Sequence, residues 1–186
     1  KTPGLAYIGS FSASGAPPTG AMYRSTDWGA TWSLVTDLDI DQGDGLGHSY
    51  HVPWPSNASE DLVYYGYRDR TSSQLKYRLH RTQGGVDVDI SPLDGGKYYG
   101  PLRGGFGVRT YDNDRRYVLL AGVGNDSDNI EPGSAGTDAV AAVFFSDDYG
   151  DTWTRLTSVV AATTNANFAY QCAFGASTPD VQYLFG

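Results

Sequence analysis

The sequence has little of what several classes of protein require. Only one of its 186 residues is a cysteine, Cys172, so no disulfide can form within the chain. Lys and Arg together number 13 against 21 Asp and Glu, which gives a formal net charge of −8. Nucleic acids and anionic membrane surfaces bind basic proteins, so this charge argues against both partners. No apolar run approaches the roughly 18 residues of a membrane-spanning helix, so we expect no membrane insertion.

Two octapeptides share one pattern. Residues 25–32 and 146–153 both fit Ser-x-Asp-x-Gly-x-Thr-Trp, and strand-like residues flank each of them. Each octapeptide is therefore predicted to be the turn of a β-hairpin, in which Asp accepts backbone N–H bonds and Gly supplies a positive φ. We expect Trp32 and Trp153 to be largely buried beneath their turns. The residues with these structural roles are Ser25, Asp27, Gly29, Trp32, Ser146, Asp148, Gly150 and Trp153.

A third, degenerate copy lies between the two octapeptides. Residues 79–90 align with residues 22–34, one residue short, and Gly84 replaces the aspartate. A Gly84-Gly85 turn can close the same hairpin without a carboxylate.

The octapeptide resembles the Asp-box, or BNR repeat, of sialidase-like and xyloglucanase-like β-propellers. The resemblance implies an all-β fold whose blades have four antiparallel strands each, and the spacing of strand-like segments suits that unit. The expected sections are a partial blade at 1–40, blades at about 46–92 and 104–158, and a partial blade at 167–186. Closed propellers have roughly four to eight blades, so we expect an incomplete ring, with the remaining blades supplied by the same or another chain.

Two functions follow as hypotheses from this resemblance. The first is an extracellular carbohydrate-recognising module that binds a polysaccharide or glycan and forms part of a glycoside hydrolase if it is an enzyme. The second is a non-catalytic structural or protein-interaction module of a fibre, adhesin or assembly factor. The Arg-Ile-Pro segment of sialidases is missing, which argues against sialidase activity.

The loops opposite the octapeptides are expected to carry any ligand site, because binding residues usually lie on long loops that a rigid scaffold positions. One cluster there consists of Arg68 and Asp69 with His48 and Tyr50. Residues 63–69 look like the strand end that carries a catalytic aspartate in xyloglucanase-like propellers, which makes Asp69 the catalytic candidate. Flanking arginines would lower the pKa of its carboxyl, as suits a base or nucleophile. Glycoside hydrolysis needs a second carboxylate, which has no clear counterpart here, and a solvated surface ion pair is the alternative.

A second cluster lies in the predicted loop Leu93–Gly105. Tyr98, Tyr99 and Arg103 could stack against and hydrogen-bond a sugar ring. Packing of the aromatic rings between blades is the alternative.

The remaining candidates concern calcium and glycans. Asp37, Asp39 and Asp41 place oxygen ligands at alternate positions, as calcium loops do, but His48 stands where the bidentate Glu would be. A solvated loop is the alternative, and no other cofactor is expected. Asn57 and Asn125 begin Asn-x-Ser sequons, which are compatible with glycosylation and secretion. Cys172 is expected to be a small buried residue on a strand rather than a reactive thiol.

Overall fold

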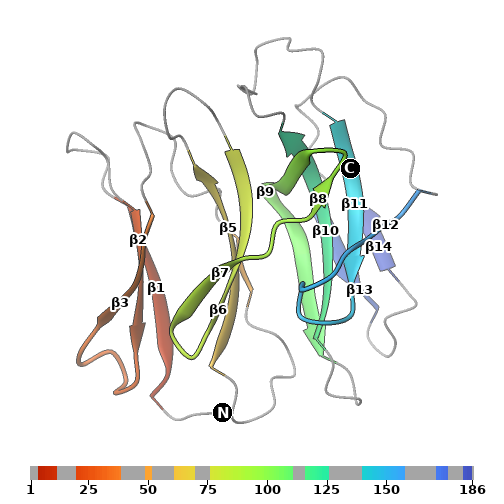
Figure 1. Cartoon of the computed structure of the whole chain (residues 1–186). Coiled ribbons are helices and arrows are strands. Elements are labelled where there is room, and N and C mark those ends of the chain that lie inside the picture. The colour runs from red at the N-terminus through yellow and green to blue at the C-terminus, as the bar shows by residue number, and fades with distance from the viewer. Residues whose placement is uncertain are drawn as a thin grey trace.

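The computed structural model of this chain describes residues 4–11, 20–38, 49–51, 61–69, 76–110, 116–125, 140–157, 171–175 and 182–185. All regular elements in this part of the chain are β-strands, and every paired strand is antiparallel to its neighbour. The strands form four open sheets (Figure 1). The all-β prediction is therefore confirmed.

The first two sheets follow chain order. The first sheet consists of β1 (Ala6–Phe11), β2 (Gly20–Ser25) and β3 (Ser33–Leu38). The second consists of β4 (Ser49–His51), β5 (Leu62–Asp69), β6 (Lys76–Gln83) and β7 (Val86–Asp89).

The third sheet runs in the order β12-β11-β10-β9-β8, and the fourth pairs β13 with β14. Their strands are β8 (Leu93–Asp94), β9 (Lys97–Thr110), β10 (Arg116–Asn125), β11 (Val140–Ser146), β12 (Thr154–Arg155), β13 (Gln171–Phe174) and β14 (Gln182–Phe185).

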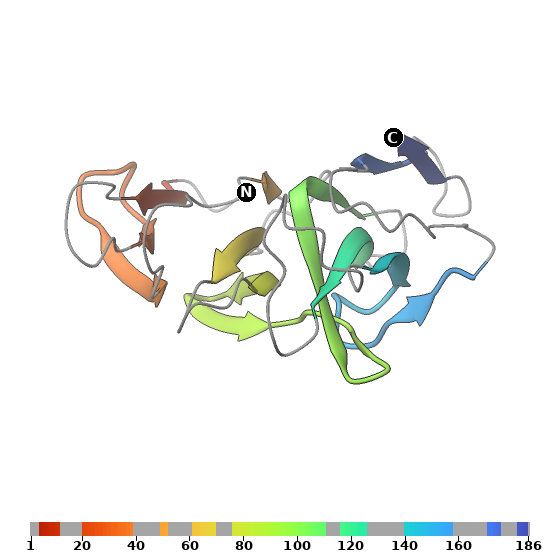
Figure 2. The same ribbon diagram turned by 90° about the horizontal axis from the view of Figure 1, so that it is seen from above.

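The sheets stack face to face in chain order, as Figures 1 and 2 show from two directions. The reason is visible in β10, where successive side chains point to opposite faces. Val118 and Leu120 join a core with Leu62 and Tyr64 of the second sheet. Their chain neighbours Tyr117 and Leu119 instead pack with β13, through Cys172 and Phe174. The third sheet is therefore apolar on both faces.

Among the described residues, the contact between the first and second sheets combines apolar and polar side chains. Met22 and Tyr65 are both fully buried there, and Tyr7 packs against them. The hydroxyl of Tyr7 donates a hydrogen bond to Asp61, which also pairs with Arg24.

Two glycines permit a very close approach of neighbouring sheets. A Cβ at Gly66 of β5 would lie 2.3 Å from Cγ of Pro101 in β9. A Cβ at Gly107 of β9 would lie 2.9 Å from the carbonyl oxygen of Cys172 in β13. Side chains at these positions would push the sheets apart.

Two short hairpins use paired glycines. Gly84 and Gly85, with φ of 60° and 82°, close the β6–β7 hairpin as predicted. Gly95 and Gly96, with φ of 60° and 81°, close a second hairpin between β8 and β9. The prediction of a loop over Leu93–Gly105 is therefore wrong, because this segment turns once and continues into the 14-residue strand β9.

Candidate functional site

The two octapeptides have the same internal hydrogen bonds. In the first, the Ser25 hydroxyl donates to Asp27 Oδ1 at 2.8 Å and accepts from the Gly29 N–H at 2.9 Å. Asp27 accepts from the backbone N–H of Thr31 at 2.8 Å and from its hydroxyl at 2.5 Å.

The second octapeptide repeats this set with Ser146, Asp148, Gly150 and Thr152. The corresponding distances are 2.8, 2.9, 2.9 and 2.6 Å. The prediction that each aspartate accepts a backbone hydrogen bond within its own octapeptide is confirmed.

The backbone conformations also agree. Trp28 and Tyr149 have φ of 62° and 69°, and the glycines after them have φ of 85° and 89°. A bulky residue adopts a positive φ only when its surroundings hold it there. The serine and aspartate bonds on both sides of the turn provide that restraint.

These bonds stabilise the ionised carboxylates. Hydrogen bonds from the Thr31 side chain and backbone, with one from Ser25, lower the pKa of Asp27 to about 2. Burial opposes ionisation of Asp148, but bonds from Thr152 and Ser146 outweigh it, so the pKa of Asp148 is also lowered.

The tryptophans differ between the two octapeptides. Trp153 is half-buried and donates its indole N–H to the carbonyl oxygen of Ile90 at 2.8 Å. Trp32 is 42% exposed, so the prediction that it is largely buried is wrong. The turn alone does not cover the ring, because the cover of Trp153 comes from the neighbouring second sheet.

The second sheet makes three further contacts with the second octapeptide. The Arg81 guanidinium donates to the carbonyl oxygen of Tyr149 at 3.0 Å and lies 3.1 Å from the carboxylate of Asp151. The hydroxyl of Tyr64 donates to the same carbonyl oxygen at 3.1 Å. Both donors are buried, so the carbonyl of this turn is bound from across the sheet boundary.

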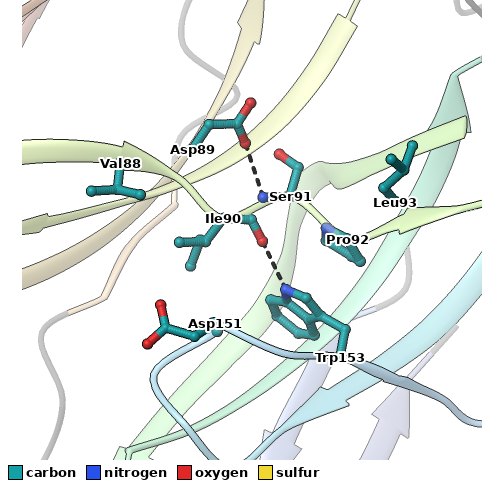
Figure 3. Close-up of a pocket in the computed structure, with 9 residues that line it drawn as sticks. Val88, Asp89, Ile90, Ser91, Pro92, Leu93, Asp151 and Trp153 are labelled. Carbon is teal, nitrogen blue, oxygen red and sulfur yellow. Dashed lines mark hydrogen bonds between the residues drawn. The ribbon is translucent and has the colours of Figure 1, made fainter.

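A cavity of about 360 Å³ lies where the chain passes from the second sheet to the third. Residues 88–93 line one side of it, and Gly150, Asp151 and Trp153 line the other (Figure 3). Leu93 is 59% exposed at its edge.

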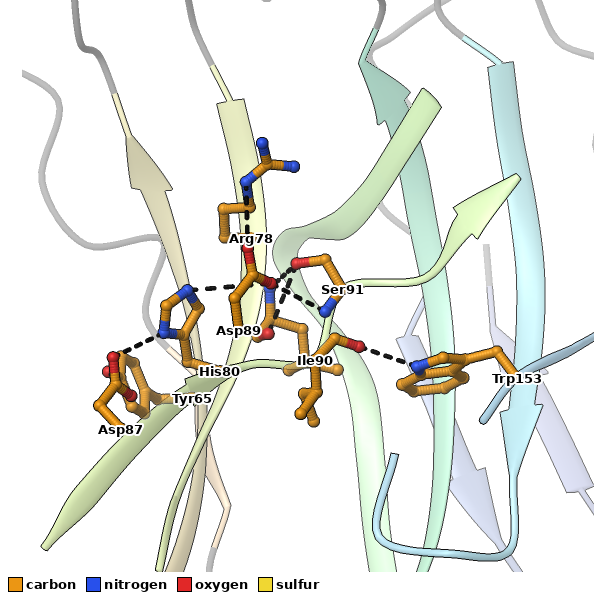
Figure 4. A network of polar contacts seen from close by, with 9 residues as sticks. Tyr65, Arg78, His80, Asp87, Asp89, Ile90, Ser91 and Trp153 are labelled. Atoms are coloured by element: carbon orange, nitrogen blue, oxygen red, sulfur yellow. Dashed lines mark hydrogen bonds and ion pairs between the residues drawn. The ribbon is translucent and has the colours of Figure 1, made fainter. Parts of the chain in front are cut away.

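A chain of polar contacts runs through the second sheet next to this cavity (Figure 4). The Tyr65 hydroxyl donates to Asp87 Oδ1 at 2.6 Å, and His80 Nδ1 lies 2.8 Å from Asp87 Oδ2. Two residues before His80 on β6, Arg78 Nε lies 3.5 Å from the carboxylate of Asp89 on β7, and Asp89 lines the cavity.

Arg78 also contacts an aromatic ring of the third sheet. Its guanidinium carbon lies 4.0 Å from the ring centroid of Tyr98, which is 40% exposed. Tyr98 pairs directly with Leu93 across the β8–β9 hairpin, so both side chains lie on one face of the sheet. Tyr98, Arg78, Asp89 and Leu93 are called the Tyr98 patch below.

Tyr98 lies at the end of the third sheet away from the second octapeptide, whereas Asp89 and Leu93 line the cavity that Trp153 also lines. Tyr98 pairs with Asn125 at one end of β10, whereas Ser146 pairs with Val118 near the other. The backbone of Arg68 lies at the corresponding end of β5, away from the Gly84-Gly85 turn.

Only two of the six predicted ligand residues have described side chains, and they point in opposite directions. Tyr98 is exposed, whereas Tyr99 is 2% exposed and packs against Phe144, with 4.8 Å between ring centroids. Phe144 belongs to the same sheet, but Tyr99 also joins the core with Leu62 and Tyr64 of the second sheet. Tyr99 therefore serves packing between sheets, the alternative left open by the sequence.

Other predicted residues are placed by backbone alone or lie outside the described residues. Tyr50 lies in β4, Arg68 and Asp69 end β5, Arg103 lies in β9, Asp37 in β3, and Asn125 ends β10. His48, Asp39, Asp41 and Asn57 lie outside the described residues.

Sequence reasoning missed Arg78, Asp89 and the adjoining cavity. A usable signal was present, because Arg78 and His80 alternate on one strand, as Asp87 and Asp89 do on the next. Opposite charges at alternate positions of paired strands meet on one face.

No protein-family model, curated protein or solved structure matches this chain. Among the described residues, no three His, Cys, Asp or Glu side chains form a group that could hold a metal ion. The described part of the chain also contains no helix with the length and apolar character needed to cross a membrane.

Proposed function

We propose that this chain forms consecutive blades of an Asp-box β-propeller that recognises carbohydrate outside the cell, at the Tyr98 patch. The observation that carries the binding proposal is the ring of Tyr98, which is 40% exposed and has the guanidinium of Arg78 over one face, so that a sugar would pack on the other face. The proposal concerns binding, without a bond-breaking step.

The propeller part of the proposal is supported by repetition. Two octapeptides have matching hydrogen bonds, and sheets of similar design stack face to face in chain order. Radial repetition of such sheets is how propellers limit their exposed strand edges.

The chemistry of the Tyr98 patch suits a sugar. The apolar C–H face of a sugar packs on an aromatic ring, while the hydroxyls of the sugar bond to guanidinium donors and carboxylate acceptors. Tyr98 supplies the ring, and Arg78 and Asp89 supply the polar groups beside it. The cavity of about 360 Å³ is in the lower range of small-ligand sites, which fits a short stretch of a polysaccharide. The net charge of −8 favours a neutral polysaccharide over a polyanion.

Affinity gel electrophoresis of the full chain in soluble neutral polysaccharides tests this proposal. We expect retardation of the wild type and about tenfold weaker binding for Tyr98→Ala, the loss that about 1.4 kcal/mol produces. Tyr98→Phe keeps the ring and should retain most of the binding. Trp28→Ala is the matched control, because Trp28 is an exposed aromatic residue outside the Tyr98 patch, in the first octapeptide.

Two results would reject carbohydrate recognition at this patch. One is equal retardation of the wild type and Tyr98→Ala, and the other is no retardation of the wild type in any polysaccharide tested. In either case the second candidate function, a protein-interaction module, would be favoured by the exposed apolar face of the first sheet.

A further inference from the structure

The first sheet has one covered face and one exposed face. Met22 and Val35 pack toward the second sheet. On the opposite face, Ile8, Tyr23 and Leu34 lie directly across from one another on the three strands. Ile8 is 50% exposed and Leu34 is 56% exposed, and Tyr23 between them is half-buried. We call these three residues the exposed row.

The third sheet contains an equivalent row whose two apolar members are covered, whereas Arg155, the equivalent of Leu34, is exposed. Leu120, Phe144 and Arg155 are paired across β10, β11 and β12 in the same register relative to the second octapeptide. Leu120 and Phe144 are 0% and 2% exposed. The second sheet buries them, through a core that includes Leu79 and Ile90.

The octapeptides show the same contrast. A Cβ at Gly150 would lie 2.7 Å from Ile90 Cδ1, so the second sheet closes tightly on that turn. At Gly29, the ring of Trp32 alone among the described residues lies within 4 Å of such a Cβ. Trp28 is 82% exposed.

We propose that the exposed row and the first octapeptide bind a further antiparallel β-sheet of the same kind as β4–β7. The partner sheet carries an apolar residue in the place of Ile90, whose carbonyl oxygen accepts the indole N–H of Trp32. It carries an arginine in the place of Arg81, which donates to the carbonyl oxygen of Trp28. This inference rests on the propeller part of the proposed function and specifies the chemistry of the next sheet. It does not depend on carbohydrate binding, because it uses the other end of the stack and none of the Tyr98 patch.

The internal interface defines the chemistry of the partner. Trp153, Tyr149 and Gly150 find an indole acceptor, an arginine donor and an isoleucine side chain in the second sheet. Trp32, Trp28 and Gly29 occupy the same positions of the first octapeptide. Ala30 replaces Asp151, so the partner arginine bonds to the turn carbonyl without an ion pair.

A second copy of this chain is not the occupant that fits. The face of β4–β7 that carries Tyr64, Leu79 and Ile90 is already covered by the third sheet of its own chain. The partner is therefore a further sheet with the same face exposed.

The test grafts a second copy of residues 49–92 ahead of residue 1 of the full chain through a flexible Gly/Ser linker. Trp32 is followed by fluorine NMR of 5-fluorotryptophan, with its resonance assigned by Trp32→Phe. We expect the solvent isotope shift of Trp32 to be large in the ungrafted chain and lost in the graft. The melting temperature should rise by about 2–4 °C or more. The matched control graft carries Ile90→Asp in the added copy and should protect Trp32 much less.

A gain of interaction provides the second arm. Ala30→Asp introduces a carboxylate at the position equivalent to Asp151, where the grafted Arg81 can pair with it. This substitution should raise the melting temperature of the graft further while leaving the ungrafted chain almost unchanged. Arg81→Leu in the added copy should abolish the gain.

Two outcomes would overturn the proposal. The first is an exposed Trp32 in the graft both with and without Ala30→Asp. The second is an ungrafted chain that sediments as a dimer with Trp32 protected, which would assign the face to a second copy instead.

Discussion

Trp153 and Ile90 are joined by a hydrogen bond of 2.8 Å between the indole N–H and a backbone carbonyl oxygen, across the boundary between two sheets. Ile90 lies just after β7, and Trp153 lies just before β12. The bond therefore fixes the third sheet to the segment that leaves the second.

Replacing Trp153 should be far more harmful than replacing Trp32. Trp153→Ala removes a half-buried ring and leaves the Ile90 carbonyl without this donor, so we expect a loss of about 3–5 kcal/mol in the free energy of unfolding. Trp32→Ala acts on a ring that is 42% exposed, and we expect about 1 kcal/mol or less. Urea unfolding of both variants measures the difference. Equal losses would contradict the assignment of the covering role to the second sheet.

The two octapeptide glycines should also respond differently to alanine. Both have a positive φ, so Gly29→Ala should reduce stability by roughly 1 kcal/mol. Gly150→Ala adds a contact with Ile90 Cδ1 and should cost about 1–3 kcal/mol more. Ile90→Val removes that Cδ1 atom. In a double-mutant cycle, the variant with both Gly150→Ala and Ile90→Val should therefore lose less unfolding free energy than the sum of the two single losses. Additive losses would mean that the two residues do not press on each other.

Acid should weaken the first octapeptide within a defined pH range. The pKa of Asp27 is lowered to about 2, below the value of about 4 of an unfolded chain. Its contribution to stability is therefore fully present above about pH 4 and is lost as the pH falls toward 2. Carbon NMR of the Asp27 carboxyl should show this midpoint. Thr31→Ala removes the side-chain donor and should move the midpoint upward, whereas an unchanged midpoint would reject the bond as the cause.

Alkali should weaken the contact between the first and second sheets. Burial, followed by the hydrogen bond to Asp61, raises the pKa of Tyr7 to about 12. The stabilisation is thus complete below about pH 10, the ordinary pKa of tyrosine, and is lost as the pH rises through 12. Difference absorbance between the wild type and Tyr7→Phe should isolate this late titration. A Tyr7 titration near pH 10 would disprove the buried bond.

The β6–β7 hairpin should tolerate asparagine but resist a β-branched residue. Gly84 has φ of 60°, and a Cβ at this position would meet no heavy atom of the described residues within 4 Å. Asparagine adopts this conformation readily, so Gly84→Asn should leave stability within about 0.5 kcal/mol of the wild type. Gly84→Val should lose about 1 kcal/mol or more, because valine is strained at positive φ. Thermal unfolding distinguishes the two variants, and equal melting temperatures would contradict the turn conformation.

Local patterns in the sequence were sufficient for the turns. The bonds of Asp27 and the glycine pair at Gly84-Gly85 depend on residues close in sequence, and both were predicted correctly. The Gly95-Gly96 pair carries the same signal, but the surrounding residues were interpreted as a ligand loop. Strand alternation would have shown that Tyr98 and Tyr99 must face opposite ways.

Contacts between sheets could not be predicted in the same way. The burial of Trp153 depends on Ile90, which lies 63 residues earlier in the chain. The sequence pattern around Trp32 is the same, so the pattern alone does not distinguish a covered ring from an exposed one. The Tyr98 patch likewise combines Arg78 and Tyr98 from different sheets.

Gly66 and Gly107 have no side chain, and this affects the spacing between the sheets. They let β5 and β9, and then β9 and β13, approach closely, while a cavity remains between residues 88–93 and the second octapeptide. The second and third sheets therefore touch at Gly66 and are separated by a cavity beside Trp153, so they do not lie at one uniform spacing. The closest approach is set by a position where one more carbon atom would not fit.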